Sequence, residues 1–247
     1  MLEFIFMLTH HDQTISNALA VYDEIRDVPL RYVGFKDVGV PHATLRELTR
    51  RMHADGRQVM LEVVSERVED ELRSVAAAAE IGVDWVLGGT HPDEALAALA
   101  AAGANVRYCP FPGRVIGHPS LLRGIVDEIA TSAKDLTALD GVFGLDLLAY
   151  RFDGDVEALV TAVVAASSGP VIAAGSVDSV KRIRTLGRLG VWGFTIGGAV
   201  FEGRLPADPS VRAQLVMALA AADDVTGGVG EPVSRCRSIS SPRSGEA

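Results

Sequence analysis

Eight short apolar runs alternate along the chain with segments that favour helices, and this alternation restricts the fold more than any other feature. The runs cover residues 3–8, 31–35, 58–64, 84–87, 105–109, 142–149, 171–174 and 193–196. Runs of this length are typical of parallel strands buried on both faces, and the intervening helices would cover the sheet. The sequence therefore predicts an α/β fold in which the ends of all strands gather at one face.

The last two runs each pass directly into a glycine turn and then into a helix-forming segment. The first turn contains Gly175 and Ser176, and the second contains Gly197 and Gly198. Backbone N–H groups at the start of a helix attract anions, and the Ser176 hydroxyl is a further donor. These four residues are predicted to bind one phosphate group, although glycine also occurs in such turns without a ligand.

The pattern VIAAGSVDS, followed by GFTIGGAVFEG, resembles the closing quarter of the phosphate-binding (β/α)8 barrels. It is similar to the sugar-phosphate isomerases of histidine and tryptophan biosynthesis and, more loosely, to ribulose-phosphate and hexosamine-phosphate epimerases. In those families the loops after strands seven and eight hold a substrate phosphate, which is a general tendency of this barrel. The resemblance implies a TIM barrel that binds a phosphorylated substrate.

The length of the chain fits one such domain, because 247 residues match the usual size of this barrel, about 250 residues. We expect the single (β/α)8 barrel to occupy residues 1–222, with a closing helix over residues 211–222. Residues 223–247 contain few large apolar side chains, so burial would not offset the entropy of ordering them. They are predicted to form a disordered tail.

Three charged residues lie within or directly after otherwise apolar runs: Lys36, Glu62 and Asp146. Such charges are costly unless they are paired or face a wet cavity. A lysine beside a bound sugar can stabilise an enediolate while a carboxylate moves a proton next to the carbonyl. We interpret these residues as the catalytic set. The alternative is an ion pair between Lys36 and Glu62 that only fills the barrel.

Other polar residues that follow strands are expected at the same mouth, and five of them are predicted to bind substrate. These are His10, Asp12, His91, Arg114 and Arg151. The two arginines are candidates for clamping a second anionic group or are solvated loop charges. Arg114 belongs to the longest connection, residues 110–119, which is predicted to be a lid or substrate wall. A helix is expected from residue 120.

The acid–base pair of the histidine- and tryptophan-pathway isomerases does not carry over to this chain. Those enzymes use aspartates that end strands one and five. Here Asp12 is offset from the end of the first strand, and the fifth strand ends in Cys109 with no acid. The resemblance therefore supports the phosphate site but not the same catalytic residues.

No cofactor is firmly predicted, but a divalent metal ion is compatible with the sequence. Imidazole and carboxylate ligands suit several such ions, and His10, His11 and Asp12 are adjacent in the chain. Glu62, His91 or Asp146 would complete the ligand set.

The formal net charge of −9 opposes general binding to nucleic acid or to anionic membranes, because both require a basic surface. Two cysteines, no signal-peptide pattern and no apolar run of about 20 residues favour the cytoplasm. A small phosphorylated metabolite is the expected partner, and a homo-oligomer is compatible with the sequence.

The predicted activity is isomerisation or epimerisation of a small phosphorylated sugar or related metabolite by proton transfer next to a carbonyl. One alternative is a carbon–carbon lyase or aldolase, either metal-assisted or acting through a Schiff base on Lys36. The other is a phosphometabolite-binding barrel without catalytic activity.

Overall fold

Eight parallel strands form the centre of the protein in a computed structural model that describes residues 2–65, 67–117 and 119–227. The strands are β1 (Glu3–Met7), β4 (Tyr32–Lys36), β5 (Gln58–Val63), β6 (Trp85–Gly88), β7 (Arg107–Cys109), β10 (Leu145–Leu147), β11 (Val171–Ala173) and β12 (Gly193–Ile196). They are neighbours in the order β10-β11-β12-β1-β4-β5-β6-β7. All eight predicted strands are confirmed, within a few residues at each end.

Two backbone hydrogen bonds join the outer strands of this sheet, β7 and β10, and so close it into a barrel. The N–H of Phe143 donates to the carbonyl oxygen of Tyr108 at 2.8 Å, and that of Asp146 donates to Pro110 at 3.0 Å. Closure leaves neither strand as an exposed edge. The predicted (β/α)8 barrel is therefore the observed fold.

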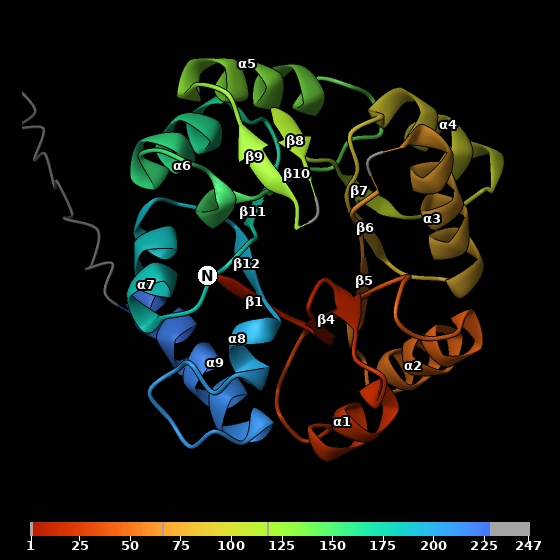
Figure 1. Ribbon diagram of the computed structural model, residues 1–247, viewed down its shortest axis with the longest axis vertical. Helices are drawn as coiled ribbons and strands as arrows, with labels where there is room; N and C mark the ends of the chain where they lie inside the picture. Colours follow the sequence, from red (N-terminus) through yellow and green to blue (C-terminus); the bar gives the residue numbers. More distant parts are fainter. Residues whose placement is uncertain (1, 66, 118, 228–247) are drawn as a thin grey trace, which may run out of the picture.

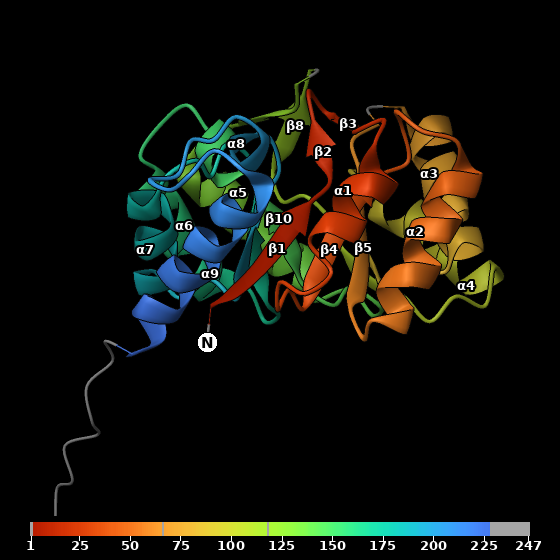
Figure 2. The same ribbon diagram turned by 90° about the horizontal axis from the view of Figure 1, so that it is seen from below.

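The helices lie around the outside of the barrel (Figure 1). They are α1 (Ala18–Glu24), α2 (His42–Ala54), α3 (Val68–Ile81), α4 (Pro92–Ala101), α5 (Val126–Thr137), α6 (Val156–Ala166), α7 (Val180–Arg188), α8 (Gly198–Phe201) and α9 (Val211–Gly227), with the 3₁₀ turn η1 (Ala149–Arg151). Two small hairpins, β2 (Thr9–His10) with β3 (Gln13–Thr14) and β8 (Arg114–Ile116) with β9 (Leu121–Arg123), are antiparallel. Figure 2 shows β2, β3 and β8 projecting at the end opposite to the N-terminus.

The connection after β7 differs from the prediction of a loop followed by a helix from residue 120. The segment β8 pairs with β9, and helix α5 begins only at Val126. Val115 lies opposite Leu122, whose side chain is fully buried. Burial of Leu122 by the hairpin explains why the residues after 120 extend as a strand instead of joining the helix.

Helix α9 continues beyond the predicted end at residue 222, so residues 223–227 are helical and do not belong to a disordered tail. Val225 packs against the core and lies beside Gly187 of α7, where a larger residue would collide with it. This contact explains the longer helix. Residues 228–247, the rest of the predicted tail, lie outside the described residues.

Alternation along the strands separates an inner from an outer core. Inward-facing apolar side chains form one cluster: Ile5, Met7, Tyr32, Met60, Trp85, Leu87, Cys109 and Ile172. The outward-facing side chains pack against the helices in a second, larger cluster. On β4 and β5 the inward positions continue from Tyr32 and Met60 to Lys36 and Glu62, which are directly opposite each other. The strand register thus places both charged residues inside the barrel at the carboxyl ends of the strands.

Aromatic rings fill the barrel at the other end. Trp85 lies against Tyr32, Phe143 and Trp192 with ring centroids 5.0 to 6.1 Å apart. Edge-to-face and offset contacts of this kind stabilise a packed apolar layer. This end of the barrel is therefore a filled core, and the mouth lies at the carboxyl ends of the strands.

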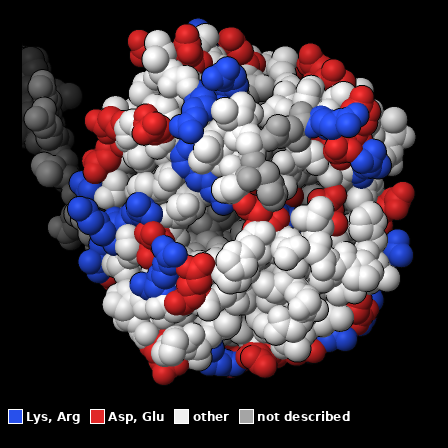
Figure 3. Space-filling view, in the orientation of Figure 1, with Lys and Arg blue, Asp and Glu red and all other residues white. Residues whose placement is uncertain are grey.

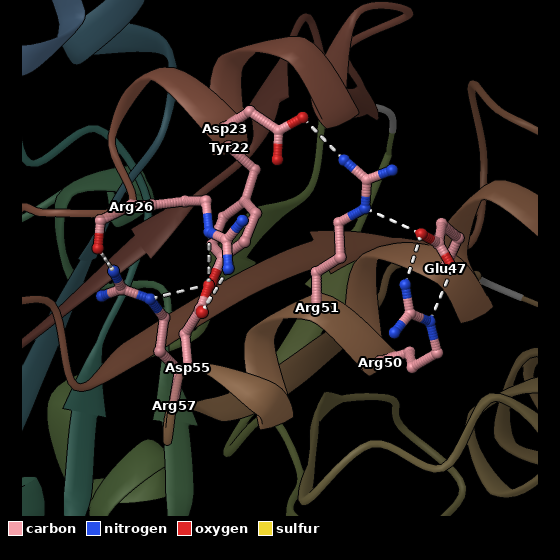
Figure 4. Close-up of polar contacts among 8 residues, drawn as sticks. All are labelled: Tyr22, Asp23, Arg26, Glu47, Arg50, Arg51, Asp55 and Arg57. Carbon is pink, nitrogen blue, oxygen red and sulfur yellow. Dashed lines mark hydrogen bonds and ion pairs between the residues drawn. The ribbon is translucent and has the colours of Figure 1, made fainter.

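A buried arginine fixes the connection between α1 and β4 (Figure 4). Arg57 donates to the Tyr22 hydroxyl and to the backbone carbonyls of Arg26, Val28 and Leu30 at 2.5 to 3.1 Å. Tyr22 in turn donates to Asp55 at 2.7 Å. Burial and the hydrogen bond to Asp55 raise the pKa of Tyr22 to about 12. Because every member has a partner, this network serves the structure and leaves no group free for catalysis.

Candidate functional site

A cavity of about 240 Å³ opens at the mouth of the barrel. Charged side chains of both signs border a hollow near the centre of this face (Figure 3). Nine of the twelve predicted site residues line the cavity: His10, Asp12, Lys36, Glu62, Arg151, Gly175, Ser176, Gly197 and Gly198. Three do not line it, namely His91, Arg114 and Asp146. The mouth therefore brings together most of the residues that the strand ends indicated.

The hairpin between β2 and β3 carries Asp12 back over the barrel. His11 and Asp12 both have left-handed backbone conformations, with φ of 51° and 58°. The Thr14 hydroxyl ties the hairpin to β4, because it donates to the Lys36 carbonyl at 2.6 Å and accepts from the Lys36 N–H at 2.9 Å. This local fold explains how an aspartate offset from the strand end reaches the centre of the mouth.

Lys36 forms the centre of an ionic cluster on the cavity floor. Its Nζ lies 2.8 Å from Asp12 Oδ1 and 3.7 Å from Glu62 Oε2. Asp12 also accepts a hydrogen bond from Arg151 Nη2 at 3.3 Å. Burial acts to raise the pKa of Asp12, but the charges and hydrogen bonds of Lys36 and Arg151 outweigh burial and hold this pKa below its usual value. Asp12 is therefore ionised at neutral pH and fixes the Lys36 ammonium in place.

Asp146 lies beneath this floor instead of in the cavity. Its side chain is fully buried, and neither carboxyl oxygen has a hydrogen-bond partner among the described residues. Burial raises the pKa of Asp146 well above its usual value, and the nearby negative charge of Glu62 raises it further. Of the two carboxyl groups in the predicted catalytic set, Glu62 lines the cavity and Asp146 does not.

The two glycine turns line the same cavity and together form what we call the glycine cradle, residues 175–177 and 197–199. Among the described residues, the backbone N–H groups of Gly175, Ser176 and Val177 have no protein acceptor. The N–H groups of Gly198 and Ala199 at the start of α8 also have no acceptor among the described residues, whereas that of Val200 donates to the Gly197 carbonyl at 2.9 Å. Both turns therefore face one cavity, and the cradle has donors available for an anion.

Charged residues that the sequence analysis did not single out surround the cradle. Asp178, Glu202 and Arg204 line the cavity, and Arg204 bonds to Glu202 at 2.5 Å and lies 3.6 Å from Asp178. His10 Nε2 lies 3.1 Å from the same glutamate. All three missed residues follow strands β11 and β12, and that position is the signal that identifies them.

The metal site considered for His10, His11 and Asp12 lacks a suitable set of ligands among the described residues. Within the part of the chain that the structure describes, no group of three or more His, Cys, Asp or Glu residues is arranged to hold an ion. The His10 and His11 rings lie against each other with centroids 3.8 Å apart, and Asp12 is engaged by Lys36. The residues present therefore do not fit the metal-binding alternative.

His91 has a structural position, contrary to its predicted role in substrate binding. Its Nδ1 lies 2.8 Å from the fully buried carboxylate of Glu71, which also accepts from the backbone N–H groups of Thr90 and His91. Helix α4 starts at Pro92, so Glu71 accepts from the two backbone N–H groups that directly precede the helix. The ring is held outside the cavity by this arrangement.

Arg114 is exposed on β8 and does not reach the cavity either. The hairpin instead lines a smaller hollow of about 130 Å³ through Val115 and Ser120, together with Phe111 from the segment before the hairpin. Phe111 is buried and packs against Gly88. The predicted lid is thus a hairpin packed beside the mouth. His118 lies outside the described residues.

The fold and this mouth define the protein as a (β/α)8 barrel with a polar, glycine-lined cavity. Solved structures share the fold. Orotidine 5'-phosphate decarboxylase from Pyrococcus horikoshii OT3 matches with a TM-score of 0.63 and 12% identity over 91% of this chain and 99% of that one. Mandelate oxidase matches with a TM-score of 0.62 and 15% identity over 91% and 73%.

A regulatory protein is also similar in fold. The glycerol uptake operon antiterminator regulatory protein from Listeria monocytogenes str. 4b F2365 matches with a TM-score of 0.54 and 14% identity over 79% of this chain and 91% of that one. No known protein family and no curated protein sequence matches the chain. The similarities therefore establish the barrel fold, and any inference about function has to come from the residues of the site.

None of the helices in the described ranges is long and apolar enough to cross a membrane.

Proposed function

We propose that the protein is an enzyme that isomerises or epimerises a small phosphorylated sugar or related metabolite. The observation that carries the proposal is that one cavity contains both the glycine cradle and the Lys36 cluster. The first supplies donors for a phosphate, and the second supplies a fixed cation and a carboxylate for proton transfer. Binding at one end of the cavity would orient the reacting carbon at the other.

Proton transfer next to a carbonyl needs a base and a stabiliser of the enediolate. In the proposed reaction Lys36 is the stabiliser, and the proposal is supported by its position in the cavity and its bond to Asp12. Glu62, 3.7 Å from Lys36, is the proposed base that removes the proton and returns it. Asp146 acts from below: its proton removes the repulsion that a second carboxylate would exert on Glu62.

A carbon–carbon lyase is the second candidate, and the shared fold with orotidine 5'-phosphate decarboxylase supports it. The same lysine would stabilise or protonate the carbanion left after bond cleavage. A Schiff base is the weaker version of this reaction, because Lys36 would have to leave both carboxylates and react as the uncharged amine. Borohydride trapping with candidate substrates tests that version directly.

A binding protein without turnover is the third candidate, and the shared fold with an antiterminator regulatory protein supports it. This role would use the cradle but would not need Lys36 or Glu62. Phosphate binding together with no turnover of any phosphorylated sugar by the wild-type protein would favour it.

The decisive experiment measures proton exchange in heavy water across a panel of phosphorylated sugars. An isomerase or epimerase is expected to introduce deuterium next to the carbonyl and to leave the carbon skeleton intact. A lyase would release a smaller product instead. Exchange by the wild-type protein that persists unchanged in Glu62→Gln would contradict the proposed base. Inorganic phosphate, titrated separately, is expected to bind to the wild-type protein.

A further inference from the structure

Ser176 has an unusual backbone conformation at the centre of the glycine cradle. Its φ is 58°, and within the described ranges only His11 and Asp12 share a positive φ among residues other than glycine. Such a conformation costs on the order of 1 kcal/mol or more and persists only when neighbouring groups hold it. Gly175 before it also has a positive φ, of 76°. Some contact must therefore stabilise this turn.

Arg182 provides that contact. Its Nη1 donates to the carbonyl oxygen of Ser176 at 2.6 Å and lies 2.7 Å from Asp178 Oδ1. Its guanidinium also lies over the Tyr150 ring, 4.5 Å from the centroid. These three partners come from the turn, from the residues before α7 and from η1. A planar guanidinium with several fixed partners holds one orientation, which a lysine could reproduce only in part.

The direction of the Ser176 carbonyl determines the direction of the next N–H group. In a trans peptide unit the C=O and the following N–H point to opposite sides. Ser176 and Val177 line the cavity, whereas Arg182 does not. Because the Ser176 carbonyl points toward Arg182, the Val177 N–H points away from Arg182. That N–H has no protein acceptor among the described residues.

We propose that Arg182 is a positioning residue of the glycine cradle, which holds the Ser176 carbonyl outside the cavity so that the Val177 N–H faces the substrate phosphate. This inference rests on the proposed phosphate site. Arg182 acts without touching the anion. If Arg182 were lost, the peptide unit could rotate and direct a carbonyl oxygen at the anion, which would repel it.

The test compares Arg182→Met with Arg184→Met in the full-length protein. Arg184 lies on the same helix, is exposed and pairs with Asp224, so its loss changes the net charge equally without affecting the cradle. Calorimetric titration with inorganic phosphate is expected to give a dissociation constant at least tenfold higher for Arg182→Met than for wild type. Arg184→Met is expected to bind within twofold of wild type, and Arg182→Lys to give an intermediate value.

A second measurement separates positioning from a general loss of structure. In wild type, the amide resonances of Val177 and Gly198 are both expected to shift as phosphate is added. In Arg182→Met the Val177 shift should be lost, while Gly198, in the other turn, should still respond. Equal phosphate affinity in Arg182→Met and Arg184→Met would overturn the role of Arg182 alone. Absence of phosphate binding by wild type would overturn both this role and the proposed site.

Discussion

Lys36 forms its shortest ionic contact with Asp12, at 2.8 Å, and a longer one with Glu62, at 3.7 Å. The lysine is 3% exposed, so its charge is shielded from solvent and its orientation depends on these partners. Asp12 is also bonded to Arg151. Asp12 is thus held by two cations, and Glu62, the proton carrier of the proposed reaction, makes the longer contact with Lys36.

Replacement of Lys36 by methionine tests this division of roles. We expect turnover to fall by about 10²- to 10⁴-fold, the range typical for loss of a group that acts in proton transfer. Phosphate affinity should change little, because the glycine cradle contains no part of Lys36. Lys134→Met is the matched control, since Lys134 is exposed on α5 and its loss changes the net charge equally. Loss of phosphate binding together with turnover would assign Lys36 to the phosphate site instead.

The main outlines of the site could be predicted because they depend on local patterns. The apolar runs identified the strands, and the strand ends identified the mouth. Gly175 and Gly197 directly follow two of those runs, so their convergence follows from the barrel itself. Lys36 and Glu62 share the inward position of adjacent strands, and their pairing follows from the register.

The remaining contacts depend on long-range geometry that no local pattern shows. Asp12 reaches Lys36 only because two consecutive residues take left-handed conformations. The His91 ring is hydrogen-bonded to Glu71, which belongs to the preceding helix and lies twenty residues earlier in the sequence. Asp146 lies on β10 between outward-facing leucines, but its complete burial depends on the packing of the whole barrel and not on its own strand.

Asp146→Asn should show an effect on stability that grows with pH. The pKa of Asp146 is raised in the folded protein, so the native state keeps a proton that the unfolded chain loses above pH of about 4. Wild-type stability should therefore fall as pH rises through the folded pKa, by about 1.4 kcal/mol per pH unit at most. The asparagine variant lacks this titration, so its stability relative to wild type should increase with pH. Urea unfolding between pH 4 and pH 9 measures the difference.

Asp12→Asn should show the opposite dependence of stability on pH. The pKa of Asp12 is lowered in the folded protein, so its stabilising contribution is present above pH of about 4 and is lost as pH falls through the folded pKa. The loss of stability of Asp12→Asn relative to wild type should be constant around neutral pH and should become smaller at acid pH. Parallel pH profiles for wild type and both variants would contradict the assigned protonation states.

His91→Ala should retain turnover within about twofold of wild type, because the ring lies outside the cavity and contacts Glu71. The buried glutamate would lose one hydrogen-bond partner, at a cost of about 1 to 2 kcal/mol in the free energy of unfolding. Steady-state kinetics and urea unfolding of the same preparation separate the two effects. A large loss of turnover at unchanged stability would instead support the predicted role of His91 in substrate binding.

Gly175→Ala tests the closest packing in the glycine cradle. A Cβ at this position would lie 2.8 Å from Arg151 Cγ and 3.1 Å from its Cδ, so the arginine would have to move. Movement would break its bonds to Asp12 at 3.3 Å and to the Ser120 carbonyl at 3.2 Å. Both the phosphate site and the Lys36 cluster would then be disturbed by one methyl group.

Gly103→Ala is the control that isolates this clash from backbone strain. Gly103 has φ of 60°, close to the 76° of Gly175, but a Cβ there would meet no atom within 4 Å. Both variants should lose about 1 to 2 kcal/mol of stability from the left-handed conformation, and Gly175→Ala about 1 kcal/mol more from the broken hydrogen bonds. Phosphate affinity should fall at least tenfold in Gly175→Ala and remain unchanged in Gly103→Ala. If titration with phosphate gave the same affinity for both variants, the cradle could not lie against Arg151 as described.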